Sequence, residues 1–211
     1  MKGFSSFILA LVITVEIVPG TTYSICPGVN IVTRAQWGAM KPKSVTPLKT
    51  PVGYFFIHHT ATPSCTNITS CSERVRGIQK YHMKNKGWAD IGYSFLAGED
   101  GNIYEGRGWK AVGAHTKGYN SRSLAVSFIG NYMQRIPNSK AISAARGLIS
   151  CGVAQKYLTT DYDLLGHRDV GQTDCPGDAL YKYIRTWPHY NKTVEYLRYK
   201  QLGDLLEKIF G

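Results

Sequence analysis

The sequence lacks an apolar run of the roughly eighteen residues that a membrane-spanning helix requires. It also lacks a repeat of roughly 20–50 residues, which argues against solenoids and propellers. Acidic residues are scarce: 14 Asp and Glu stand against 25 Lys and Arg, so the formal net charge is +11. A field of that sign favours polyanionic partners but does not select among them. The length of 211 residues suits one domain with a single core.

The first residues predict a secretory signal peptide rather than a structural element. A basic start precedes the apolar stretch 7–15, which Glu16 then interrupts. We therefore expect residues 1–24 to be a signal peptide and the mature protein to be secreted and extracellular, without stable membrane insertion. Two sequons are usable only in the secretory route, and we expect N-glycosylation at Asn67 and Asn191.

Cysteines number five, and in a secreted protein an odd count leaves one of them free, intermolecular or bound to a metal. Cys65 and Cys71 flank a short polar loop and can form a local disulfide. Cys26 and Cys151 can join the N-terminal segment to a distant helix. With these two disulfides Cys175 would be unpaired, although the sequence alone does not fix the pairing.

Strand and helix patterns alternate along the chain. Short β-rich segments occur at 52–59, 93–97, 102–105, 124–129 and around 164–165. Helical patterns start at Ser70 or Ser72, end near Gly87, and recur at 140–157 and near 178–186. The alternation predicts the α/β class, with a single domain built on a central mixed β-sheet flanked by helices.

The stretch 191–211 predicts an amphipathic helix. Its apolar residues recur at near-helical spacing: Val194, Leu197, Leu202, Leu205, Leu206 and Ile209. Such a helix can pack on the domain, pair with another chain or touch a membrane, and the sequence does not decide among these. The oligomeric state is equally open.

The positions of the histidines suggest a metal site. His58 ends a predicted strand, and His167 lies eight residues before Cys175. Two histidines and a cysteine can supply three ligands to zinc and leave a fourth position for water, which is the pattern of catalytic rather than structural zinc sites. Each of these residues alone is more commonly a packing or surface residue. No HExxH motif occurs, which disfavours the zincin class.

A series of motifs runs through most of the chain in a consistent order. The stretches are FIHHT (56–60), GWADIGYSF (87–95), GEDGNIYEGRGW (98–109), GAHT (113–116), GHRD (166–169), TDCPG (173–177) and WPH (187–189). Together they resemble the insect-type peptidoglycan recognition proteins, a family related to phage-type N-acetylmuramoyl-L-alanine amidases. We therefore expect a recognition and amidase domain at 25–190, with an amidase-type zinc cleft on one face, and a C-terminal extension at 191–211.

The resemblance implies a set of functional residues. The zinc ligands would be His58, His167 and Cys175. Tyr93 would donate a hydrogen bond to the oxyanion, and Thr173 would orient the water or the ligands. The implied activity is zinc-dependent hydrolysis of the amide between the muramic lactyl group and L-alanine, in innate immunity. Phage relatives have lysine in place of Thr173, whereas eukaryotic amidases of the family tolerate threonine.

The resemblance also implies a substrate preference. Gly87 and Trp88, with Arg107, match members that bind diaminopimelate-type rather than lysine-type peptidoglycan, and a guanidinium suits the additional carboxylate. His115 is a further candidate for substrate binding. The remaining histidines predict packing roles: His59, His82 and His189. Weaker groove candidates are Tyr81, Tyr119, Asn120 and Arg122.

Two other classes of function fit the sequence less well. A non-catalytic sensor that activates an immune signalling cascade would need a broken zinc triad, and here all three residues are present. A nucleic-acid binder would explain the basic charge, but the sequence has no recognisable binding motif and secretion conflicts with that role. We therefore expect peptidoglycan, and not nucleic acid, as the partner.

Overall fold

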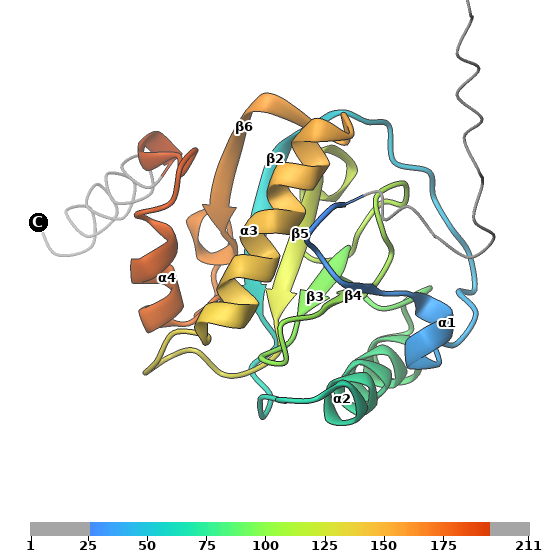
Figure 1. The fold of residues 1–211 in the computed structure, drawn as a ribbon. Helices are drawn as coiled ribbons and strands as arrows, with labels where there is room; N and C mark the ends of the chain where they lie inside the picture. Colours follow the sequence, from blue (N-terminus) through green and yellow to red (C-terminus); the bar gives the residue numbers. More distant parts are fainter. Residues whose placement is uncertain (1–25, 195–211) are drawn as a thin grey trace, which may run out of the picture.

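A six-stranded sheet forms the centre of the computed structural model, which describes residues 26–194 (Figure 1). The strand order is β1-β4-β3-β5-β2-β6. The strands are β1 (Ile31–Val32), β2 (Val52–His59), β3 (Phe95–Ala97), β4 (Ile103–Glu105), β5 (Ser123–Phe128) and β6 (Leu158–Gly166). Neighbouring strands are parallel except for the antiparallel hairpin of β3 and β4. The predicted mixed sheet is confirmed.

Helices cover both faces of this sheet. They are α1 (Arg34–Trp37), α2 (Ile68–Lys80), α3 (Ser139–Ala154) and α4 (Asp178–Ile184). A π-helical turn, η1 (Tyr81–Asn85), continues α2, and two short 3-10 turns are η2 (Asn120–Arg122) and η3 (His167–Asp169). None of the helices within residues 26–194 is long and apolar enough to cross a membrane.

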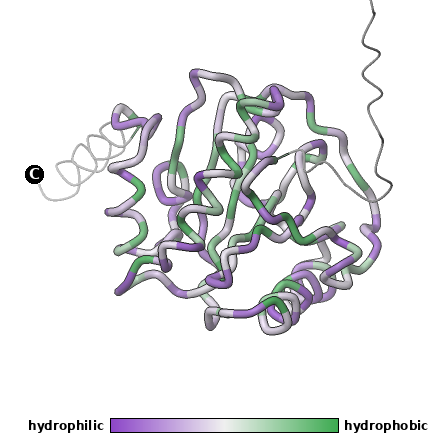
Figure 2. Tube along the Cα trace, in the orientation of Figure 1, coloured by the Kyte–Doolittle hydropathy of each residue, from purple (hydrophilic) through white to green (hydrophobic). Residues whose placement is uncertain are grey.

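The alternation of side chains along β2 separates the two faces. Phe55 and Ile57 pack in the main hydrophobic cluster with residues of α3, which lies across the sheet in Figure 1. Phe56 belongs to a different cluster, because successive strand side chains point to opposite faces. Figure 2 shows hydrophobic residues along these central strands. By the same alternation His58 lies on the face opposite α3, part of which α2 covers.

Several element boundaries differ from the prediction. Asn67, and not Ser70 or Ser72, caps α2, because its side chain accepts a hydrogen bond from the backbone N–H of Ser70 at 2.9 Å. β6 extends over nine residues rather than the short strand predicted around 164–165. This strand is at the edge of the sheet and its first half includes exposed polar residues, so no apolar run marks it. The short elements β1 and α1 were not predicted.

Two disulfides resolve the cysteine count. Cys26 pairs with Cys151, and Cys65 pairs with Cys71. Cys175 is therefore the free cysteine. The predicted signal peptide lies outside the described residues, as does the predicted extension beyond Val194.

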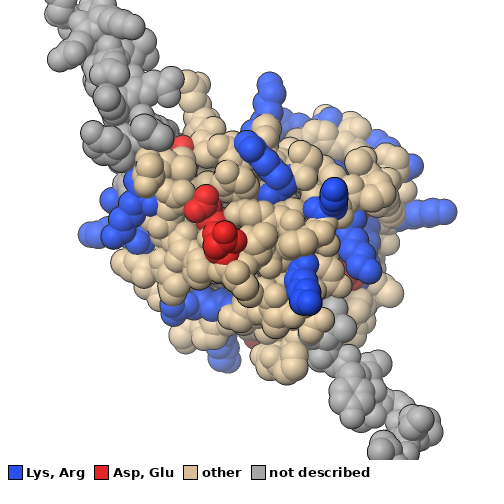
Figure 3. All heavy atoms as spheres, turned by 90° about the horizontal axis from the view of Figure 1, so that it is seen from above, with Lys and Arg blue, Asp and Glu red and all other residues tan. Residues whose placement is uncertain are grey.

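Charged residues are spread over the surface. Figure 3 shows Lys and Arg side chains scattered among uncharged residues on this face, with acidic residues between them. The basic excess therefore does not form one continuous stripe in this view.

Candidate metal centre and substrate cleft

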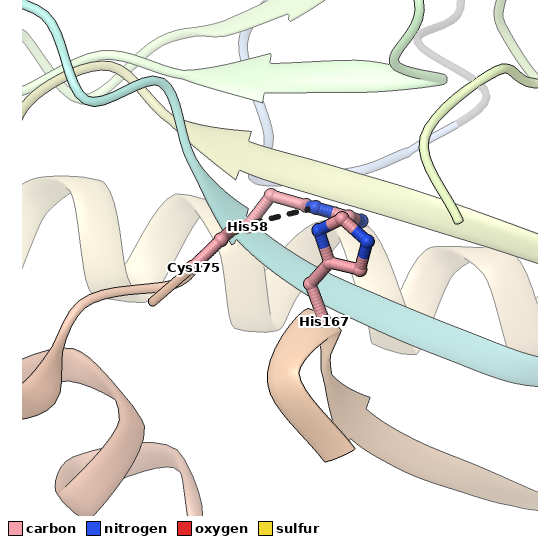
Figure 4. Close-up of side chains that lie close together, drawn as sticks. All are labelled: His58, His167 and Cys175. Atoms are coloured by element: carbon pink, nitrogen blue, oxygen red, sulfur yellow. Dashed lines mark hydrogen bonds between the residues drawn. The ribbon is translucent and has the colours of Figure 1, made fainter. Parts of the chain in front are cut away.

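The three predicted ligands come together at the carboxyl ends of two neighbouring strands. β2 and β6 are parallel, and Ile57 is in register with Gly166. The residue that follows each member of this pair is a histidine. His58 lies near the end of β2, and His167 lies at the start of η3. Cys175 approaches them from the loop before α4 (Figure 4). One potential ligand atom from each of the three lies within 4.8 Å of the others.

The spacing of these atoms fits zinc. Cys175 Sγ lies 3.5 Å from His58 Nδ1. In a tetrahedral zinc site, with Zn–S about 2.3 Å and Zn–N about 2.0–2.1 Å, the sulfur and a nitrogen ligand are about 3.5 Å apart. The other ring nitrogen of His58 lies 3.3 Å from the hydroxyl of Thr116. A partner of this kind fixes the orientation and tautomer of a ligating imidazole.

In the metal-free site, the protonation states of the two histidines favour metal binding by their imidazole rings. Burial lowers the pKa of His58 well below its usual range, and the neighbouring His115 and His167 lower it further. Burial also lowers the pKa of His167. Both rings therefore keep lone pairs available at neutral pH. Burial raises the pKa of the Cys175 thiol to about 12 without a metal, so a metal that binds there must displace the thiol proton.

Backbone contacts hold Cys175 in this position. Its sulfur accepts a hydrogen bond from the backbone N–H of His59 at 3.4 Å. Its own backbone N–H donates to the hydroxyl of Thr173 at 3.2 Å. The His59 ring accepts the backbone N–H of Tyr132 at 3.3 Å, but the residue, predicted to pack away from the cleft, also lines the cavity beside the ligands. Thr173 thus shapes the ligand loop as well as lining the cleft.

A cavity of about 280 Å³ opens beside the three ligands. Its walls combine the ligands with most of the other predicted site residues. The lining residues are His58, His59, Ala61, His82, Trp88, Tyr93, Ala114, His115, His167, Thr173 and Cys175. A second cavity of about 550 Å³ runs along α2 and shares His82 and Tyr93 with the first. The two cavities therefore adjoin at these two side chains.

Known proteins resemble this chain in sequence and in fold. The family described as N-acetylmuramoyl-L-alanine amidase matches residues 48–178. "Peptidoglycan recognition protein 1" of Bos taurus is 48% identical over 164 residues, 77% of this chain and 86% of that protein. "N-acetylmuramoyl-L-alanine amidase" of Homo sapiens is 46% identical over 177 residues, 81% of this chain and 30% of that protein. The solved structure of peptidoglycan recognition protein-LE with tracheal cytotoxin is 46% identical, with a TM-score of 0.75 over 76% of this chain and 95% of that one. The chain belongs to the peptidoglycan recognition protein family.

Tyr93, the family's catalytic tyrosine by resemblance, faces the metal centre. Its ring centroid lies 5.5 Å from that of His58. Burial, and then the nearby Cys175, raise the pKa of Tyr93 above its usual value. The phenol therefore stays protonated at physiological pH and is available as a hydrogen-bond donor.

Arg107 is not among the residues that line the cavity beside the ligands. Its Nε donates to the carbonyl of Ile91 and its Nη1 to the carbonyl of Val112, each at 2.7 Å. The residue lines a separate cavity of about 120 Å³. Burial is the main cause of the lowered pKa of His82 and of His115, and the positive charge of Arg107 lowers both further, so its field reaches the cleft. Gly87 has a φ of 73° at the turn that leads into Trp88.

Two residues of the site were not predicted from the sequence to belong to it. His82, predicted only to pack, lies against Trp88 with 4.7 Å between ring centroids and a tilt of 31° between the ring planes, and it lines both cavities. Thr116 links two site histidines, because its hydroxyl lies 3.0 Å from His115 Nδ1 as well as 3.3 Å from His58 Nε2. The resemblance included GAHT as a motif, which was the available signal for Thr116.

The weaker candidates have mostly structural roles. The Asn120 side chain accepts the backbone N–H groups of His115 and Thr116, each at 2.9 Å. The Arg122 guanidinium lies 4.4 Å from the ring centroid of Tyr119. Tyr81 lines the larger cavity. His189, as predicted, packs, with its ring stacked on Tyr162.

The buried His82 predicts acid sensitivity of the metal-free protein. Burial, followed by the charges of Arg107 and Lys86, lowers the pKa of His82 to about 4, against about 6.5 for an unfolded chain. Between these two values the unfolded chain binds a proton that the folded protein does not. Stability is therefore fully present above the unfolded pKa and falls as the pH drops toward 4, by about 3 kcal/mol for this one residue.

Chemical denaturation at about pH 7 and about pH 4 measures this effect. We expect His82→Asn to show a smaller acid-induced loss in the free energy of unfolding than the wild type. His189→Asn removes an exposed imidazole instead and should keep the full loss. Equal acid-induced losses in His82→Asn and the wild type would contradict the assignment.

Proposed function

We propose that this protein is a zinc-dependent N-acetylmuramoyl-L-alanine amidase that hydrolyses bacterial peptidoglycan outside the cell, as part of innate immunity. The observation that carries the proposal is the convergence of His58, His167 and Cys175 beside a cleft lined by Tyr93 and Thr173. Three ligands, rather than four, are the pattern of a catalytic zinc site. A non-catalytic sensor remains the alternative, and the intact ligand set speaks against it.

The reaction adds water across the amide between the muramic lactyl group and L-alanine. It breaks the C–N bond and leaves a lactyl carboxylate and a free amino group on the stem peptide. When bound, zinc supplies a Lewis acid that polarises the carbonyl and lowers the pKa of water toward about 7. The phenol of Tyr93 donates to the carbonyl oxygen as negative charge develops there. Thr173 keeps the Cys175 loop in place through its bond to the backbone N–H.

A diaminopimelate-type stem peptide is the substrate class that we propose. A solved relative of 46% identity is in complex with tracheal cytotoxin, a monomeric diaminopimelic acid-type peptidoglycan. This chain has the Gly87-Trp88 pair and Arg107 that the resemblance associates with that type. Arg107 Nη2, which takes part in neither of the two backbone hydrogen bonds, would donate a charge-assisted hydrogen bond to the additional carboxylate, a contact worth about 1.5–3 kcal/mol.

The test combines metal analysis with two substrates. We expect about one zinc per purified chain, and release of stem peptide from both wall types. The value of kcat/KM for diaminopimelate-type peptidoglycan should exceed that for lysine-type by at least about tenfold, as expected from the energy of that contact. Protein without zinc that still hydrolyses would overturn the metal assignment. A preference for lysine-type peptidoglycan would overturn the substrate assignment.

Other expectations concern secretion and partners. Residues 1–24 would direct the chain to the secretory route, where Asn67 and Asn191 would be glycosylated. In support, both asparagines use Oδ1 to accept backbone N–H groups, and glycans attach through the other atom, Nδ2. The scattered charges in Figure 3 do not resemble the basic stripe of a nucleic-acid interface.

A further inference from the structure

Arg168 joins the two segments that carry the second and third ligands. It directly follows His167, and its backbone N–H donates to the carbonyl of Cys175 at 3.0 Å. Most of the residues between these ligands lie on the surface, half-buried or exposed. The turn at His167 and the loop at Cys175 therefore need a contact that sets their separation.

The guanidinium of Arg168 holds the cysteine loop on both sides of the ligand. Its Nη2 donates to the carbonyl of Asp174, immediately before Cys175. Its Nη1 donates to the Asp178 carboxylate at 2.7 Å, at the first residue of α4. The Arg168 side chain is only 15% exposed and lies 4.8 Å above the ring centroid of Tyr181. A single residue thus connects the loop, the helix that follows it and the turn at His167.

The turn that carries Arg168 is itself firmly anchored. The neighbouring Asp169 accepts the backbone N–H of Gly166 at 2.7 Å through one carboxylate oxygen. The other oxygen accepts the hydroxyls of Tyr181 at 2.6 Å and Tyr190 at 3.0 Å. Because this turn is held by buried groups, Arg168 ties the more exposed cysteine loop to a fixed support.

We propose that Arg168 is a positioning residue that sets the place of the Cys175 sulfur relative to His58 and His167, and that zinc affinity depends on it. This inference rests on the proposed function. Without the guanidinium the loop would keep its backbone contacts but lose its link to Asp174 and Asp178. The positions of the three ligands would then be less restricted. Part of the free energy of zinc binding would be needed to order the loop.

The decisive measurement is the zinc dissociation constant of the full chain, obtained by competition with a chelator. For Arg168→Gln we expect an increase of about 10–100-fold, the range found when groups that orient metal ligands are removed. Arg168→Lys keeps the charge but cannot bridge both partners, and should recover only part of the affinity. The cobalt-substituted protein gives a second readout, because a displaced sulfur weakens the thiolate-to-cobalt absorption band.

Arg34→Gln is the matched control. Arg34 also bridges an aspartate and backbone carbonyls, with an ion pair to Asp90 at 3.0 Å and a hydrogen bond to the Met40 carbonyl at 3.0 Å. It lies between β1 and α2, on the sheet edge away from β6. The control should lower thermal stability, as any lost arginine bridge does, and leave the zinc dissociation constant within about twofold of the wild type.

The outcomes separate the inference from the proposed function. Wild-type protein that binds no zinc refutes the proposed function, and with it this inference. Tight zinc binding by the wild type and by Arg168→Gln alike refutes the inference alone. If Arg168→Gln does not fold, Asp178→Ala replaces it, because that change removes only the exposed partner of Nη1. An unchanged dissociation constant and cobalt spectrum in Asp178→Ala would then count against the role.

Discussion

Replacing Cys175 by serine should abolish both zinc binding and amide hydrolysis while the domain stays folded. The sulfur lies 3.5 Å from His58 Nδ1 and is the only thiol not used in a disulfide. A serine hydroxyl stays protonated at neutral pH and is a poor ligand for zinc, so the site would keep two ligands instead of three. The change is small in volume, and a serine oxygen can still accept the backbone N–H of His59.

Metal analysis after dialysis, and release of stem peptide from peptidoglycan, measure the two losses. We expect zinc per chain to fall from about one to near zero, and hydrolysis to fall to background. A double variant, Cys65→Ser with Cys71→Ser, removes two other sulfurs outside the metal centre and should keep its zinc. Retention of full zinc content by Cys175→Ser, with wild-type hydrolysis, would show that the reaction does not depend on this ligand.

The central strands of the fold were predictable because their signal is local. The predicted segment 52–59 coincides with β2, since a continuous β-rich run marks a strand that is buried on both faces. β6 has exposed polar residues at the sheet edge, and its length follows from pairing with β2 rather than from its own pattern. α1 is too short to show a period, and it is held by Trp37, whose indole N–H donates to the Glu105 carbonyl at 2.9 Å. Such long-range contacts produce no recognisable pattern in the local sequence.

The ligands of the candidate site were found through motifs, but their geometry was not. Nothing in the sequence states that β6 lies beside β2, and that pairing is what brings His167 next to His58. The contact of Thr116 with His58 likewise depends on how a distant loop folds over the strand end. Arg107 shows a further limit. The motif implied a guanidinium that suits the substrate carboxylate, and it gave no sign that two of its nitrogens bind backbone carbonyls.

Tyr93→Phe should reduce kcat by about 10²–10³-fold while zinc content stays at the wild-type level. Removal of one preorganised donor to a developing oxyanion costs about 2.7–4 kcal/mol in well-studied hydrolases. The phenol is uncharged at neutral pH, and its environment raises its pKa further, so the substitution removes a donor without changing the charge of the cleft. Because the contact strengthens in the transition state, KM should change much less than kcat.

Tyr81→Phe provides the comparison within the same cleft. Tyr81 lines the larger cavity, is 49% exposed and does not line the cavity beside the three candidate ligands. We expect its kcat to stay near the wild-type value. Steady-state kinetics on a soluble muropeptide, together with zinc analysis, distinguish the two variants. Wild-type kcat in Tyr93→Phe would exclude a role for the phenol in the chemical step. Loss of zinc from that variant would instead assign the residue to holding the metal site together, because a donor to the oxyanion has no part in binding the metal.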